Sequence, residues 1–185
     1  SPGRKTNAAG GRSRERRTFG EDSREKSRAE KLDEGLDVLT GLWSGQPFSY
    51  DGKHYHIQDA LFLPRPFQAP RIPIWVCGAW SARKAPFRRA ACWDGVVAIS
   101  AENRAITPDE ISNLQNYIAS HRNTGEHFDI VVILWSEGLH TPEEQREIER
   151  YENAGTTWWL EDLSLERYSS LGEVRTRLHQ GPPGC

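Results

Sequence analysis

A basic turn between two apolar segments is the part of the sequence best suited to chemistry. Arg83 and Lys84 precede Pro86 in this turn, and Arg88 and Arg89 follow it. Pro86 suits the first position of a helix, because proline lacks an N–H group that would have no partner there. The unpaired N–H groups of a helix start and four cations could together hold a phosphate. The alternative is a solvated basic helix on the outside of the protein.

Two apolar segments flank the turn and must position it. Residues 74–76 lead into Gly78, and residues 96–99 follow Gly95. Each run is too short for a helix and is typical of a buried strand. Residues 72–100 are therefore predicted to form a strand, a short helix and a second strand, which is a βαβ unit.

The same alternation of strand and helix continues toward the end of the chain. Residues 107–110 read TPDE, in which the threonine can cap a helix and the glutamate can complete a capping box, and residues 141–144 read TPEE. Residues 128–134 and 156–160 are apolar runs that predict two more strands. Four successive βα units imply parallel strands with right-handed crossovers. The four strands are predicted to start near residues 73, 94, 128 and 156.

The chain before residue 72 follows a different pattern. Residues 1–25 are rich in Gly, Arg, Ser, Glu and Lys and are predicted to be a flexible arm, with a solvated linker favoured over an RNA-binding tail. Residues 26–43 carry apolar side chains every three or four residues, which predicts an amphipathic helix. The pair Asp51-Gly52 then favours a tight hairpin turn with positive φ. A small hairpin is therefore expected after the helix.

Candidate metal and redox residues are few. His54 and His56 would share one face of the second hairpin strand, but no third ligand is evident nearby, so no metal site is predicted. Cys77, Cys92 and Cys185 match no zinc or redox spacing. Cys77 and Cys92 are expected to be small buried hydrophobic side chains. Free cysteines favour a reducing compartment, and the cytoplasm is the expected location.

Composition limits the classes of function. The chain has 185 residues and a formal net charge of -2, and its mean hydropathy is -0.72. This charge favours neither nucleic acid nor an anionic membrane as a partner. The apolar runs are far shorter than a membrane span, so the chain is expected to be soluble. The length suits one domain with a sizeable core.

Several segments together resemble the luciferase-like monooxygenase family, which includes flavin-dependent oxygenases and deazaflavin-dependent oxidoreductases. The resemblance extends from about residue 28 to residue 183. The matching stretches are RAEKLDEGLDVLTGLWSGQPFSYDGKHYHI, FLPRPFQAPRIPIWVCGAW, RRAACWDGVVAIS and YENAGTTWWLE. Family members are (β/α)8 TIM barrels, and these segments look like the helix after the fourth strand, an excursion loop and strands five to eight.

The resemblance implies the C-terminal half of a (β/α)8 barrel with an inserted β-hairpin, in a domain of residues 26–185. A complete barrel of this type needs about 250 residues, and the first four strands have no counterpart here. The remaining strands would leave two unpaired edges and a half-exposed interior face. A truncated gene product is one expectation, and a half-barrel that needs a second chain is the other.

The resemblance also implies a cofactor, either FMN or the deazaflavin coenzyme F420, and a small-molecule substrate. It assigns the cofactor phosphate to the loop after the family's fifth strand, with Arg83 as a neighbouring cation. Trp80 would either stack on the cofactor ring or pack at the strand end. The predicted cofactor-binding residues are Gly78, Ala79, Trp80, Ser81 and Arg83.

Two carboxylates near predicted strand ends are candidates for an acid or base. Glu137 and Glu161 could move a proton, although carboxylates at strand ends are also common solvated residues. Trp158 and Trp159 must point to opposite faces of their strand, and core packing is expected for both. The implied activity is that of a flavin- or deazaflavin-dependent oxidoreductase or monooxygenase. The alternative is a non-catalytic half-barrel that binds a partner subunit in a homo- or hetero-oligomer.

Overall fold

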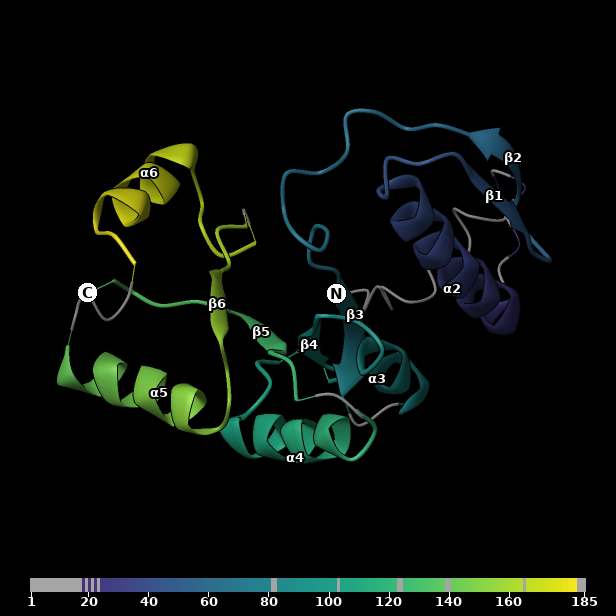
Figure 1. Cartoon of the computed structure of the whole chain (residues 1–185). Helices are drawn as coiled ribbons and strands as arrows, with labels where there is room; N and C mark the ends of the chain where they lie inside the picture. The colour runs from purple at the N-terminus through teal and green to yellow at the C-terminus, as the bar shows by residue number, and fades with distance from the viewer. Residues whose placement is uncertain are drawn as a thin grey trace. The chain divides into compact units, whose positions relative to one another are not determined.

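The computed structural model describes residues 18, 20, 22, 24–80, 83–102, 104–122, 125–138, 141–164 and 166–182 (Figure 1). The chain divides into two compact units, Ser1–Ile72 and Pro73–Cys185. Most of the predicted arm of residues 1–25 lies outside the described residues. The arm and the single domain of residues 26–185 therefore stay predictions.

The described residues of the first unit include a long helix and a hairpin. Helix α2 (Glu25–Leu42) is followed by strands β1 (Phe48–Asp51) and β2 (His56–Ala60), which pair antiparallel. Gly45, with φ +68, lies just after the helix in the left-handed conformation that glycine adopts without strain. The helix and hairpin predicted from sequence are both present.

The turn of the hairpin differs from the expectation of a positive φ at Asp51-Gly52. Asp59, with φ 44, is the one described non-glycine residue with a positive φ, and Gly52 is not among the positive-φ glycines. Instead, Gly52 N donates to Tyr55 O at 2.9 Å, which makes a wider turn. A Cβ on Gly52 would collide with the Glu34 carboxylate and lie 2.5 Å from the Tyr50 ring. Glycine is needed here for close packing against α2, which a local sequence pattern does not reveal.

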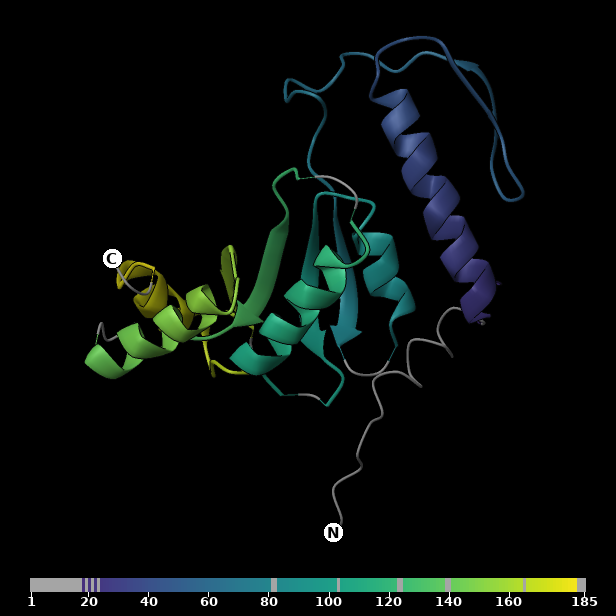
Figure 2. The ribbon, with the colours of Figure 1, turned by 60° about the horizontal axis from the view of Figure 1, so that its bottom comes forward.

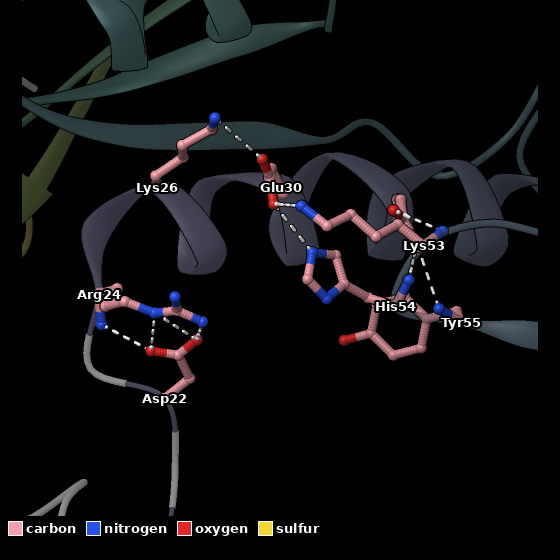
Figure 3. A network of polar contacts seen from close by, with 8 residues as sticks. Asp22, Arg24, Lys26, Glu30, Lys53, His54 and Tyr55 are labelled. Atoms are coloured by element: carbon pink, nitrogen blue, oxygen red, sulfur yellow. Dashed lines mark hydrogen bonds and ion pairs between the residues drawn. The ribbon is translucent and has the colours of Figure 1, made fainter.

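Two glutamates of α2 hold the hairpin turn against the helix (Figure 3). The Glu34 carboxylate accepts hydrogen bonds from the backbone N–H groups of Lys53, His54 and Tyr55 at 3.0, 2.8 and 3.1 Å. Burial alone would raise the pKa of Glu34, but these three donors hold it below its usual value. Glu30 Oε2 accepts from Lys53 Nζ at 2.7 Å and lies 3.1 Å from His54 Nε2. His54 is therefore used in packing the turn.

The second unit alternates strand and helix from end to end. All four strands are parallel, in the order β3-β4-β5-β6. This α/β arrangement of four βα units is the one predicted for half of a barrel, and the prediction is confirmed. The elements are β3 (Trp75–Trp80), α3 (Ala85–Ala90), β4 (Gly95–Ser100), α4 (Pro108–Ala119), β5 (Asp129–Leu134), α5 (Pro142–Asn153), β6 (Trp158–Glu161) and α6 (Leu171–His179).

The predicted caps begin the longer helices of this unit. Thr107 Oγ1 accepts from Glu110 N at 3.3 Å, and Glu110 Oε2 accepts from Thr107 N at 2.9 Å, which completes a capping box at α4. Thr141 Oγ1 accepts from Glu144 N at 3.2 Å at the start of α5. Gly155, with φ +104, follows the end of α5. Local sequence chemistry therefore sets where these helices start and stop.

The core lies between the sheet and helices α3, α4 and α5, which run along one side of the strands (Figures 1 and 2). We call the sheet face toward these helices the outer face. Side chains at alternate strand positions point to this face and are buried. Phe87 of α3 and Ile111 and Leu114 of α4 are all 0% exposed and fill the layer. The buried strand residues on this face include Val76, Trp80, Val96, Ala98, Ile130, Val132 and Leu134.

The opposite face of the sheet, which we call the inner face, is apolar and partly uncovered in the described part of the chain. Ile99 is 38% exposed, Ile133 45%, Trp158 50% and Leu160 38%. Strand β3 pairs with β4 alone and β6 with β5 alone among the described strands. The unpaired edges and exposed interior face expected from the sequence are therefore present.

The threonine cap of α4 predicts a measurable stability effect. Thr107→Ala leaves the N–H of Glu110 without its side-chain acceptor, so it is expected to lower the free energy of unfolding by about 1 kcal/mol. Urea unfolding followed by tryptophan emission measures the change. Ser112→Ala, inside the same helix, is the matched control and is expected to be neutral or slightly stabilising. Equal effects of the two substitutions would contradict the assigned cap.

The ion pair at the same cap predicts a pH dependence. The Arg104 guanidinium donates to both carboxylate oxygens of Glu110, at 2.8 and 2.9 Å, and is the main cause that lowers the pKa of Glu110 from 4.5 to about 2. Because the pKa is lower in the folded state, the contribution to stability is complete above pH 4.5. That contribution is lost as the pH falls from 4.5 toward 2.

Glu110→Gln keeps a capping-box side chain but cannot titrate. As the pH is lowered from neutral into the acid range, the free energy of unfolding of the natural chain is therefore expected to fall more steeply than that of the variant. Urea titrations at a series of pH values measure both slopes. Glu149→Gln, at an exposed position of α5, is the control and should keep the natural slope. Parallel curves for the natural chain and Glu110→Gln would refute the assignment.

Candidate functional site

The carboxyl ends of the four parallel strands lie at one edge of the sheet, where barrels of this kind bind ligands. Three predicted cofactor residues, Gly78, Ala79 and Trp80, form the last half of β3. Arg83 is exposed and lies shortly before α3, whereas Ser81 lies outside the described residues. The structure therefore brings four of the five predicted residues to the end of β3.

Gly78 points to the outer face, where α3 approaches the strand closely. A Cβ on this residue would lie 2.9 Å from Phe87 Cζ and 3.1 Å from Pro86 Cβ. Glycine is therefore required for the packing of α3 on β3, a reason that sequence reasoning missed. The predicted approach of a ligand to the backbone at Gly78 stays a prediction.

Trp80 also points to the outer face and is 6% exposed. Its ring lies 5.0 Å from that of Phe87 and 6.0 Å from that of Tyr117, both edge to face. Lys84 Nζ lies 3.1 Å from the centre of the indole ring, and burial lowers the pKa of this lysine. Of the two roles considered for Trp80, packing at the strand end is the one its contacts describe. Its contact with a cofactor stays a prediction.

Ala79 points to the inner face and is the neighbour of Ile99 in β4. Cys77 points the same way and is exposed, and Cys92 is exposed as well. The expectation that Cys77 and Cys92 are buried is therefore wrong. For Cys77 the reason is that the described helices of the second unit pack on the other face of β3, whereas an apolar strand sequence suggests cover on both faces.

Glu161 turns away from the inner face and is held by several donors. Ser136 N donates to Glu161 Oε1 at 2.6 Å, Ser136 Oγ donates to Oε2 at 3.1 Å, and Trp159 Nε1 donates to Oε2 at 3.1 Å. Arg177 Nη2 lies 3.4 Å from Oε2. These contacts give Glu161 a role in anchoring the segment after β5. Its predicted role as an acid or base stays untested.

Arg177 completes this anchor and is only 5% exposed. Its Nε donates to Ser136 O at 3.2 Å and its Nη2 to Ser136 Oγ at 2.6 Å, while Nη1 donates to Gly181 O at 2.6 Å. A buried arginine needs such partners because its charge is costly to desolvate. The arginine thus ties α6 to the end of β5. No sequence signal distinguishes it from the exposed Arg175 of the same helix.

A cleft of about 770 Å³ opens beside this anchor, within the usual size of a small-molecule site. The Arg167 guanidinium lies 3.7 Å from the centre of the Trp135 ring, and its Nε donates to Asp162 Oδ2 at 2.7 Å. Arg167 also lowers the pKa of Asp162. Glu137 is exposed and lines the cleft, and its predicted role as an acid or base stays a prediction. The remaining lining residues are Ser136, Glu166, Tyr168, Ser170, Gly172, Glu173, Thr176, Arg177 and Gln180.

A second polar centre lies on the inner face at the amino ends of the strands. Asp129 accepts from Trp75 Nε1 and Trp158 Nε1, both at 3.1 Å, and from Thr157 Oγ1 at 3.0 Å. His127 Nε2 lies 2.9 Å from the same carboxylate. Burial alone would raise the pKa of Asp129, but these neighbours hold it below its usual value. Asp129 therefore links β3, β5 and β6.

The two adjacent tryptophans of β6 point to opposite faces, as the period of a strand requires. Trp158 lies on the inner face, with its ring 5.6 Å from that of Trp75. Trp159 lies on the outer face, where its ring meets Tyr151 at 5.6 Å. Packing was expected for both, but Trp158 remains 50% exposed on the inner face.

The described residues lack two features. None of their histidine, cysteine and carboxylate side chains gather in a set of three or more that could hold a metal ion. His56 Nδ1 instead lies 2.7 Å from Asp51 Oδ1. None of the described helices is both long and apolar enough to cross a membrane.

Parts of this chain are similar to known proteins in sequence or in fold. Its sequence is 33% identical over 49 residues to an F420-dependent glucose-6-phosphate dehydrogenase of Microbacterium testaceum (strain StLB037). The matched segment covers 26% of this chain and 14% of that protein. Its fold is similar to that of an F420-dependent secondary alcohol dehydrogenase in complex with an F420-acetone adduct, with a TM-score of 0.59. That match has 15% sequence identity and covers 78% of this chain and 59% of that one. At this identity the second likeness shows the fold alone.

The chain thus matches only part of the length of both proteins. The model of one family, described as luciferase-like monooxygenase, matches residues 8–169. This range includes the helix, the hairpin and all four parallel strands. The chain therefore belongs to the luciferase-like monooxygenase family.

Proposed function

We propose that this chain supplies the C-terminal half of the barrel of a deazaflavin- or flavin-dependent oxidoreductase that acts on a small molecule. The observation that carries the proposal is the arrangement of its four parallel strands, whose carboxyl ends share one edge beside an open inner face. Barrel enzymes bind their ligands at this edge. The two similar proteins named above are both F420-dependent, which favours F420 over FMN.

The residues at the end of β3 fit a cofactor with a phosphate and a planar ring. Arg83 is exposed and cationic beside the strand end, so it can neutralise a phosphate. Ala79 presents only a methyl group to the inner face, and Ile99 lies beside it, so a flat apolar ring can lie close to the sheet. When bound, F420 supplies hydride transfer, whereas reduced FMN supplies oxygen activation. The protein supplies position and electrostatics.

The cleft beside α6 suits the substrate in this proposal. Its Trp135 and Tyr168 provide aromatic surface, and Glu137 can accept or donate a proton at the cleft wall. Glu161 and Arg177 act indirectly, because they hold Ser136 and so keep the segment of Trp135 and Glu137 in place. Glu137 is thus our candidate acid–base residue, and Glu161 is a positioning residue.

A second candidate function is a non-catalytic half-barrel that binds a partner subunit. The observation that favours it is the partly exposed apolar inner face, together with two sheet edges that have no partner among the described strands. A parallel sheet is normally covered on both faces. This function requires no cofactor, so cofactor binding separates the two candidates.

Cofactor binding by the purified chain tests the proposal. Titration with F420 and with FMN, read by quenching of cofactor fluorescence, is expected to give saturable binding of at least one of them. Arg83→Glu is expected to weaken that binding at least about tenfold, because it replaces a phosphate-neutralising cation with a carboxylate. Arg175→Glu, exposed on α6, changes the net charge equally and should leave the affinity unchanged.

Each outcome of the titration has a definite meaning. Absence of saturable binding of either cofactor would refute cofactor binding by this chain and would favour the partner-binding function. If Arg83→Glu and Arg175→Glu weaken binding equally, the effect follows net charge alone. That outcome would contradict a phosphate site at the end of β3.

A further inference from the structure

The parallel sheet is incomplete in three places that a single occupant could fill. Its inner face exposes Ile99, Ile133, Trp158 and Leu160. Among the described strands, β3 has a neighbour on one side only, and so does β6. Parallel sheets are almost always buried on both faces, and free edges are a route to aggregation.

The two edges lack the features that usually protect a free strand. Natural edge strands carry lysine, proline or inward-pointing charges that prevent pairing with another chain. Strand β3 reads WVCGAW and strand β6 reads WWLE, with neither lysine nor proline. The one charged side chain, Glu161, is turned to the outer face and held by Ser136 and Arg177. Both edges are therefore suited to pairing with a further strand.

Side chains of the two edge strands also meet over the inner face. Trp75 belongs to β3 and Trp158 to β6, with two strands between them. Their rings lie 5.6 Å apart, and both donate to Asp129. These side chains therefore converge across the inner face. The carboxylate holds the first residues of both edge strands in this arrangement.

These features restrict what can cover the sheet. The occupant must offer parallel strands that run in the same direction at both edges, and an apolar face of its own. A second copy offers both if a two-fold axis runs along the strands, because β6 of each copy then lies beside β3 of the other. Four strands from each copy make eight, the number at which side chains just fill a closed barrel.

We propose that two copies of this chain close one eight-stranded parallel barrel by pairing β6 of each copy with β3 of the other. The closed assembly has no free edge and buries both inner faces. Ala79 at the end of one β3 then lies beside the end of the partner's β6. Each cofactor site is therefore built from both copies, a consequence that rests on the proposed function, whereas the assembly itself does not.

The molar mass in solution tests the assembly. Light scattering of the purified chain at micromolar concentration is expected to give twice the mass of one chain. Leu160→Glu places a carboxylate on the inner face of β6 and is expected to give one chain mass. Leu171→Glu is the matched change at a leucine of α6 whose side chain is 69% exposed. It should leave the double mass unchanged.

A single-chain mass for the natural sequence would overturn the proposal. So would a mass above two chains, because a closed barrel has no edge left for further copies. A double mass that resists Leu160→Glu would also overturn it, since the contact would then lie elsewhere.

Hydrogen exchange of the natural chain tests the same pairing if Leu160→Glu fails to fold. Thr157 N donates to Ile130 O of β5, so the alternate N–H groups of Trp158 and Leu160 face the open edge of β6. In the two-copy barrel these two amides are expected to be protected, and dilution should remove the protection together with the double mass. Fast exchange of both amides in a sample of double mass would overturn the β6–β3 pairing.

The cofactor titration separates this proposal from the proposed function. A double mass without saturable binding of F420 or FMN supports the assembly and refutes the cofactor site. Saturable binding by a single-mass chain supports the cofactor site and overturns the assembly. Loss of binding in Leu160→Glu, with binding kept in Leu171→Glu, supports a site shared between copies.

Discussion

Successive side chains of a strand point to opposite faces of its sheet, and here the described helices of the second unit pack on one of the two faces. The other features of the second unit follow from this constraint. Gly78 and Trp80 meet α3 on the outer face, where Val76 is buried as well, while Cys77 and Ala79 face the open side. The same alternation separates Trp158 from Trp159. A strand whose sequence suits cover on both faces is thus left half uncovered.

Carboxylates that accept several hydrogen bonds hold the pieces of this fold together. Glu34 caps the hairpin turn, Asp129 gathers β3, β5 and β6, and Glu161 joins the end of β5 to α6 through Ser136 and Arg177. Each one links segments far apart in the sequence, so each fixes a distance that local propensity cannot. Partly buried carboxylates are stable only with such donors. The acidic residues that look most like catalytic candidates in the sequence can therefore be structural.

This division bears directly on the candidate site. Glu137 and Glu161 are equivalent in the sequence, because each follows or ends a predicted strand. In the structure Glu137 lines an open cleft, whereas Glu161 is occupied by Ser136 and Trp159. The cleft itself was not predicted, because Trp135 and Arg167 come together only when the segments after β5 and β6 fold against each other. No spacing rule joins residues from two separate loops.

The sequence by itself determined the order of elements, their caps and the family, because apolar periodicity and capping chemistry act within a few residues along the chain. Only the tertiary structure decided what each face of the sheet meets. It turned Gly78 and Trp80 to the helices, exposed Cys77 and gave Gly52 a packing role without a positive φ. The physical reason is that burial depends on the neighbours that arrive from distant segments, and a strand sequence does not record whether both of its faces are covered.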